Sequence, residues 1–254
     1  MKFSYEDLIS GAPIFVDKIG HFRPPKLKEL RPDGETPLWL YQVYLSILSG
    51  DKEHCLKIMK ITTGRNLKKL EEAENITVFD ALTILQQTRK LLQDAMAFFM
   101  LEIPVWDDKE RCFLITSKEG EVIGKITRSN FDDVRDMMLQ LNYINIGKSA
   151  EPIKHSSAKA KALWERVQKH LKEQSKKASP KDNNYKIGNI ISKLCAANIG
   201  YTLFNIYELT IFQLYDQFFQ YGYLRAMNLN EMAYSNHGGE KFDIQAWLKP
   251  ILKF

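Results

Sequence analysis

The chain has 254 residues, of which 44% are hydrophobic and 26% are charged, and this is the composition of an ordinary globular protein. No window approaches the roughly 20 uninterrupted apolar residues of a membrane-spanning helix, which excludes that class of protein. The formal net charge of +5 is compatible with nucleic acid as a partner but does not require one.

The N-terminal residues predict a cytoplasmic protein that begins with a β-hairpin. The first stretch, MKFSYEDLISG, carries acidic residues where a signal peptide would carry an apolar run. Between Tyr5 and Arg23 a short apolar run is followed by Gly20, which can supply the positive φ of a hairpin turn. Pro24 and Pro25 then end the second strand, because neither can donate to a ladder.

Two helices are expected next. Thr36 before Pro37 is typical of a helix start, with a capping hydroxyl and a proline whose missing N–H costs nothing there. The apolar spacing that follows predicts a helix over residues 37–49, which Gly50 ends. A second helix is expected over residues 51–60.

The stretch before the centre of the chain predicts further helices. A weaker, charged helix is expected over residues 67–74. Thr77 stands three residues before Asp80, the spacing of a capping box, and apolar residues recur at helical spacing as far as Phe98. One long helix is therefore predicted from Thr77 to Phe98.

The central region changes from helical to alternating spacing. Apolar-rich segments at 97–105, 111–116 and 121–127 are separated by polar turns, which predicts a three-stranded antiparallel meander. Ser129 is expected to cap a helix over residues 131–141, with Asp132 and Asp133 in its first turn, where negative charge complements the helix dipole.

Residues 148–186 are the most basic part of the chain. A helix is expected over residues 158–176, and the SKKASPKDNN that follows has the charge, serine and proline content of a solvated linker. We therefore divide the chain into an N-terminal α+β unit (1–147), the basic segment (148–186) and a helical C-terminal unit (187–254). Seven cations of the basic segment, in or directly after its predicted helix, are candidate phosphate contacts. They are Lys159, Lys161, Arg166, Lys169, Lys172, Lys176 and Lys177.

The C-terminal unit is expected to contain two main helices. The first occupies residues 187–200 and is closed by Gly200. The second spans Thr210–Tyr223, starts with a capping box between Thr210 and Gln213, and carries enough apolar residues to be enclosed on most sides. A short turn-rich segment is expected at 228–234. The predicted fold class is mainly α with a small antiparallel β meander.

The sequence offers no catalytic constellation, and we expect no cofactor and no bound metal. Gly120, Gly124 and Lys125 resemble a phosphate-binding loop, but the glycines are one residue too close and Ile126 replaces the hydroxyl that would hold magnesium. No two histidines have the spacing of a helical zinc pair, and the three cysteines form no CxxC pair.

Five acidic residues near the meander are the remaining candidates for acid–base chemistry or for holding a divalent ion. Roles in turns and helix caps account for them without catalysis. They are Asp107, Asp108, Asp132, Asp133 and Asp136.

Two stretches of the C-terminal unit, NIYELTIFQLYDQFFQYGY from Asn205 and FDIQAW from Phe242, carry a resemblance to a known group of proteins. They are similar to uncharacterised proteins from the tail-morphogenesis gene clusters of bacteriophages of Gram-positive bacteria, and the N-terminal YEDLISGAPIFVDKIGHFRPPKLKEL is similar to the start of such proteins. The resemblance implies a phage or prophage product in the host cytoplasm or the virion, either an assembly chaperone or a minor tail component. Its expected partners are tail proteins or further copies of itself.

Three functional hypotheses remain open on the sequence. The first is a non-enzymatic interaction protein of tail morphogenesis. The second is a nucleic-acid-associated regulator that binds through the basic segment. The third is an enzyme that uses carboxylates around the meander, and a deep pocket lined by converging acids would favour it, whereas an apolar groove would favour the first.

Overall fold

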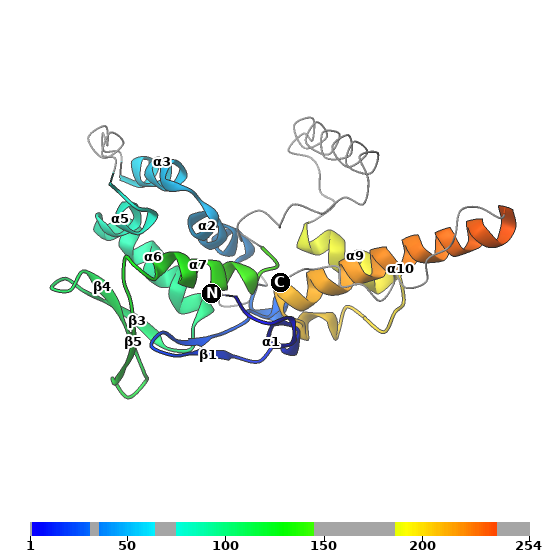
Figure 1. Ribbon diagram of the computed structural model, residues 1–254, viewed down its shortest axis with the longest axis horizontal. Coiled ribbons are helices and arrows are strands. Elements are labelled where there is room, and N and C mark those ends of the chain that lie inside the picture. The colour runs from blue at the N-terminus through cyan, green and yellow to red at the C-terminus, as the bar shows by residue number, and fades with distance from the viewer. Residues whose placement is uncertain (1, 31–35, 64–74, 145–185, 238–254) are drawn as a thin grey trace, which may run out of the picture.

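The computed structural model describes residues 2–30, 36–63, 75–144 and 186–237 (Figure 1). These residues form a mainly helical fold with one two-stranded and one three-stranded antiparallel sheet, which confirms the predicted fold class. In Figure 1 the three-stranded sheet lies at one end of the molecule and the long C-terminal helix extends from the other. The predicted helix at 67–74 and the basic segment up to residue 185 lie outside the described residues.

The predicted N-terminal hairpin is present as β1 (Ile14–Val16) and β2 (Gly20–Phe22), and Gly20 has the expected positive φ of 122°. A helix that we did not predict, α1 (Tyr5–Ser10), precedes it. Its signal was in the sequence, because Ser4 and Asp7 form a capping box and Gly11 ends the helix with a φ of 68°.

The next two helices, α2 (Leu38–Ser49) and α3 (Lys52–Thr63), confirm the predicted pair. The predicted cap is wrong, however. Pro37 is the N-cap of α2 and no side chain caps it, while the backbone N–H of Thr36 donates to the carbonyl of Glu29. The helix ends at Gly50 as expected.

The single helix predicted from Thr77 to Phe98 is two helices, α5 (Val78–Thr83) and α6 (Gln86–Phe99). The capping box between Thr77 and Asp80 is confirmed, with both reciprocal hydrogen bonds present. The helix is interrupted at Leu85, whose backbone is extended. The change of direction at this residue allows each of the two helices to bury its own apolar face.

The predicted meander is confirmed as β3 (Ile103–Asp107), β4 (Cys112–Thr116) and β5 (Val122–Ile126), paired in chain order. The first strand starts later than predicted, because residues 97–99 complete α6. One face of the sheet packs on the helices through Phe113, whose ring contacts Phe79 of α5.

The helix after the meander, α7 (Phe131–Gln140), has Asp132 and Asp133 in its first turn as predicted. Its N-cap is Asn130, not the predicted Ser129. Asn130 is held by the preceding turn, because its side-chain oxygen accepts the backbone N–H of Thr127 at 2.7 Å.

The C-terminal part consists of α9 (Ile187–Ala196), a 3-10 turn η3 (Ile206–Glu208) and α10 (Ile211–His237). Helix α9 ends four residues before Gly200, which instead supplies a positive φ of 95° in the turn that follows. The predicted capping box of α10 is confirmed, since Thr210 N–H donates to Gln213 Oε1 at 2.9 Å and Gln213 N–H donates to Thr210 Oγ1 at 3.2 Å.

Helix α10 is longer than predicted and less enclosed. It runs for 27 residues, so the turn-rich segment expected at 228–234 is wrong; those residues contain neither glycine nor proline to break the helix. Among the residues of α10 whose burial the structure describes, only the first turns reach the core, where Ile211, Phe212 and Leu214 are buried. Further along, Leu229 and Met232 are each 61% exposed.

A short backbone seam joins the N-terminal chain to the start of α10. Leu27 N–H donates to the carbonyl of Leu209 at 2.9 Å, and Ile211 N–H donates to the carbonyl of Pro25 at 3.0 Å. The side chain of Gln213 also donates to the carbonyl of Ile9 at 2.8 Å, at the end of α1. The buried residues on both sides of this seam belong to one hydrophobic core.

The cap of α10 gives a test of its role in stability. Thr210→Ala removes the oxygen that accepts the Gln213 N–H, and we expect the free energy of unfolding to fall by roughly 1 kcal/mol in urea titrations. Ser129→Ala is the control, because Ser129 is exposed and does not cap α7, and its cost should stay within about 0.5 kcal/mol. Equal costs for the two variants would contradict the assignment of the caps.

Candidate partner-binding groove

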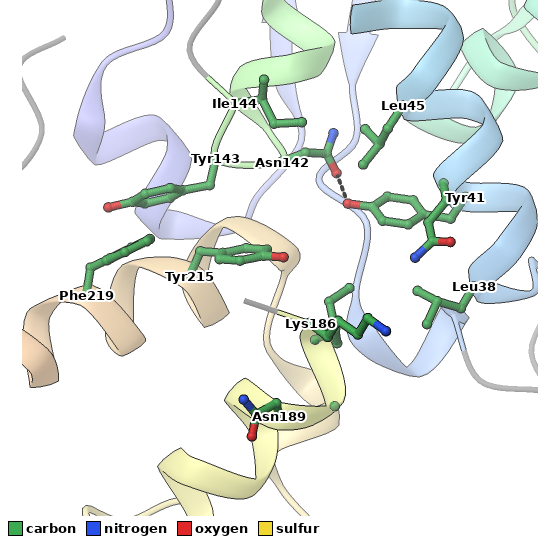
Figure 2. A pocket seen from close by; sticks show the side chains of 13 residues that line it. Leu38, Tyr41, Leu45, Asn142, Tyr143, Ile144, Lys186, Asn189, Tyr215 and Phe219 are labelled. Carbon is green, nitrogen blue, oxygen red and sulfur yellow. Dashed lines mark hydrogen bonds between the residues drawn. The ribbon is translucent and has the colours of Figure 1, made fainter. Parts of the chain in front are cut away.

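A half-open groove of about 1060 Å³ lies between α2, the turn after α7, the start of α9 and the first turns of α10 (Figure 2). Its walls therefore come from segments far apart in the sequence, brought together by the seam. The lining is mainly aliphatic and aromatic. The lining residues that carry the argument below are Leu38, Tyr41, Asn142, Tyr143, Lys186, Tyr215 and Phe219.

The aromatic wall of the groove is built on Tyr143, which ends α7 in a left-handed conformation with a φ of 61°. Such a φ is uncommon for a residue with a large side chain, and here the chain is held by hydrogen bonds from the N–H groups of Tyr143 and Ile144 to carbonyls of α7. The turn directs the Tyr143 ring onto α10. It stacks on Phe219 with ring centroids 5.3 Å apart and on Tyr215 at 6.0 Å (Figure 2).

The floor of the groove is a polar pair whose hydrogen bonds are satisfied within the protein. The hydroxyl of Tyr41 donates to Asn142 Oδ1 at 2.8 Å, and Asn142 Nδ2 donates to the carbonyl of Met138 at 2.7 Å. Both side chains are buried. This pair fixes α2 against the end of α7, because an unpaired amide or hydroxyl at this depth would be costly.

Burial sets the protonation states around the groove. It raises the pKa of Tyr41, Tyr143 and Tyr215 above the ordinary value of a phenol. All three hydroxyls therefore stay protonated at neutral pH and serve as hydrogen-bonding groups, not as bases. Among the described lining residues, Lys186 alone is charged, and it stands at the N-cap of α9.

Behind the aromatic wall, α10 carries a buried carboxyl. Asp216 is 1% exposed, and its Oδ2 accepts the hydroxyl of Tyr5 from α1 at 3.1 Å. Burial raises the pKa of Asp216, and the hydrogen bond from Tyr5 and the nearby Gln220 oppose the rise. This contact ties α1 to α10.

Several of the candidate chemical residues of the sequence have structural roles in the described part of the chain. Gly120 lies in the β4–β5 turn, and Gly124 lies against the backbone of Lys18, so neither forms a loop before a helix. Asp107 accepts backbone N–H groups of its own turn, and Asp108 pairs with Arg89. The seven candidate phosphate contacts of the basic segment lie outside the described residues.

Within the part of the chain that the structure describes, no group of three or more His, Cys, Asp or Glu residues is placed to hold a metal ion. No described helix combines the length and the apolar character needed to cross a bilayer.

In comparison with known proteins, a family model matches the C-terminal part of the chain. Residues 175–252 match the YomV second domain family. The match indicates a phage-type, YomV-like protein and covers less than half of the chain. It includes α9 and α10, which supply one side of the groove. No curated protein and no solved structure matched the chain.

The groove was not predicted as a site, although part of its signal was in the sequence. Tyr215 and Phe219 are four residues apart, so they share one face of the predicted helix. Tyr143 had no comparable local signal, because its role depends on the left-handed turn that ends α7.

The buried carboxyl of Asp216 gives a prediction about pH. Because its pKa is raised in the folded protein, the stability it contributes is fully present below its ordinary pKa of about 3.9 and is lost as the pH rises through the folded-state value. Asp216→Asn keeps an acceptor for Tyr5 and removes the buried charge. We expect the variant to have a higher melting temperature than the wild type at pH 7, with a difference that shrinks toward pH 4. A difference that does not change with pH would contradict this account.

Proposed function

We propose that this protein works by protein–protein contact, without a catalytic step, in the morphogenesis of a phage tail. It acts as an assembly chaperone in the host cytoplasm or as a minor tail component in the virion. The observation that supports this best is the groove, which is apolar, aromatic and lined by hydroxyls that stay protonated. The YomV-like match supports a phage setting, and the sequence resemblance supports the tail.

The chemistry of the groove favours a segment of a partner protein as its occupant. Leu38 is 38% exposed at one rim and Phe219 is half-buried on the opposite wall, so apolar side chains of a partner can enter between them. Lys186 adds a single positive charge beside these apolar walls. A tail-protein segment with apolar anchors next to an acidic residue fits this arrangement.

Substitutions on adjacent residues of α2 test the groove. Leu38 lines the groove, whereas its neighbour Trp39 is 64% exposed and does not. We expect Leu38→Lys to lower the affinity for the tail partner at least about tenfold, because it places a charge among the apolar anchors. Trp39→Lys should leave that affinity within about twofold.

The partner is identified first by affinity purification of the tagged protein from phage-infected cells, with nuclease added, and by mass spectrometry. Recovery of a tail tube, tape-measure or baseplate protein supports the proposal if Leu38→Lys lowers the recovered amount and Trp39→Lys does not. Loss of every partner on nuclease treatment would instead favour the nucleic-acid reading through the basic segment. The affinity of the protein for nucleic acid should then fall steeply with added salt.

A further inference from the structure

The solvent-facing side of the three-stranded sheet carries a cluster of aliphatic side chains, bordered by Lys125, which the register places opposite Leu114. Ile103 and Val105 of β3 are 51% and 43% exposed, and Val122 and Ile123 of β5 are 53% and 36% exposed. The register places Val105 opposite the half-buried Leu114 and places Val122 opposite Thr116, so β4 continues the same face. We call this surface, formed by Ile103, Val105, Leu114, Val122 and Ile123, the sheet face.

The opposite side of the sheet already has its partners. Phe113, Ile115 and Ile126 are fully buried there, and the ring of Phe113 packs on Phe79 and Trp106. An antiparallel sheet with one face in the core usually presents polar side chains to water on the other. A cluster of aliphatic side chains on that side is typical of a contact surface.

The edges of the sheet are less available to a binding partner than its face. Pro104 of the edge strand β3 has no N–H to donate, and its carbonyl accepts a hydrogen bond from the side chain of Gln93 at 2.9 Å. On the other edge, Lys125 N–H of β5 already donates to the carbonyl of Lys18 at 3.1 Å. Pairing through strand edges is therefore disfavoured, and packing onto the face is the available mode.

The charges around the sheet face are balanced. At one end the ion pair between Glu110 and Lys125 covers Cys112, which is only 1% exposed. The strands and turns from 107 to 125 carry one more acidic than basic residue, and Arg89 offsets the difference by pairing with Asp108. A neutral rim does not select a polyanion, whereas it suits a partner that carries both signs in the same arrangement.

We propose that the sheet face binds a second copy of this chain, with the two sheets packed face to face about a two-fold axis. The β-branched side chains of one face interdigitate with the same side chains of the other, as in sandwiches of two sheets. The sheet lies away from α9 and α10 in Figure 1, so this contact leaves the groove open. The inference is independent of the proposed function.

Sedimentation equilibrium of the full chain over a range of concentrations tests the inference. We expect a dimer whose fraction rises with concentration. Val105→Lys should raise the dimer dissociation constant at least about a hundredfold, because each substitution occurs twice in a two-fold interface. Leu229→Lys is the control, since Leu229 is equally apolar and 61% exposed on α10, and it should leave the dissociation constant unchanged.

A milder variant covers the case in which Val105→Lys disturbs the sheet. Val105→Thr keeps the β-branched shape and strand preference, so circular dichroism should be unchanged while the dissociation constant rises about tenfold. Three results would overturn the proposal. They are a monomer at every concentration, a dimer that neither Val105 variant weakens, and a dimer that Leu229→Lys disrupts as strongly as Val105→Lys does.

Discussion

The backbone seam between Pro25–Leu27 and Leu209–Ile211 is the contact on which the rest of the structure depends. It consists of two backbone hydrogen bonds of 2.9 and 3.0 Å, yet it joins segments more than 180 residues apart and sets where α10 begins. The capping box of α10 completes it, because the Gln213 side chain both caps its own helix and donates to α1. With this helix start in place, Phe212 enters the core that the N-terminal elements share.

The groove follows from this arrangement. One side belongs to α2 and the end of α7, and the other belongs to α9 and α10. The left-handed Tyr143 closes the junction by stacking on α10. The YomV-like match covers the second side, so any partner that enters the groove contacts this region and the N-terminal elements together. In Figure 1 the sheet lies apart from α9 and α10, so the two proposed contact surfaces are separate.

Local patterns predicted the fold well wherever a local interaction decides the structure. The boxes that begin with Thr77 and Thr210 were found because each is closed within four residues, and the meander was found because its strands alternate. The break at Leu85 was missed, since burial of each helix against distant elements decides it. The extent of α10 was missed for a local reason, because residues 228–234 contain no glycine or proline that would end the helix. The candidate site forms where the seam brings distant segments together, and no local pattern in the sequence reveals that contact. The proposed role in tail morphogenesis rests on resemblance, because the residues themselves indicate no chemistry for it.

Native-state hydrogen exchange, followed residue by residue in increasing denaturant, tests most directly whether the seam makes one cooperative unit of the two sides of the groove. We predict that amides in the first turns of α10, from Leu214 to Phe219, exchange only through the same global unfolding as the buried amides of α2, with the same free energy and the same denaturant dependence. Exchange of the α10 amides through an opening that leaves α2 protected would contradict the account, because the groove would then have one wall that unfolds independently of the other.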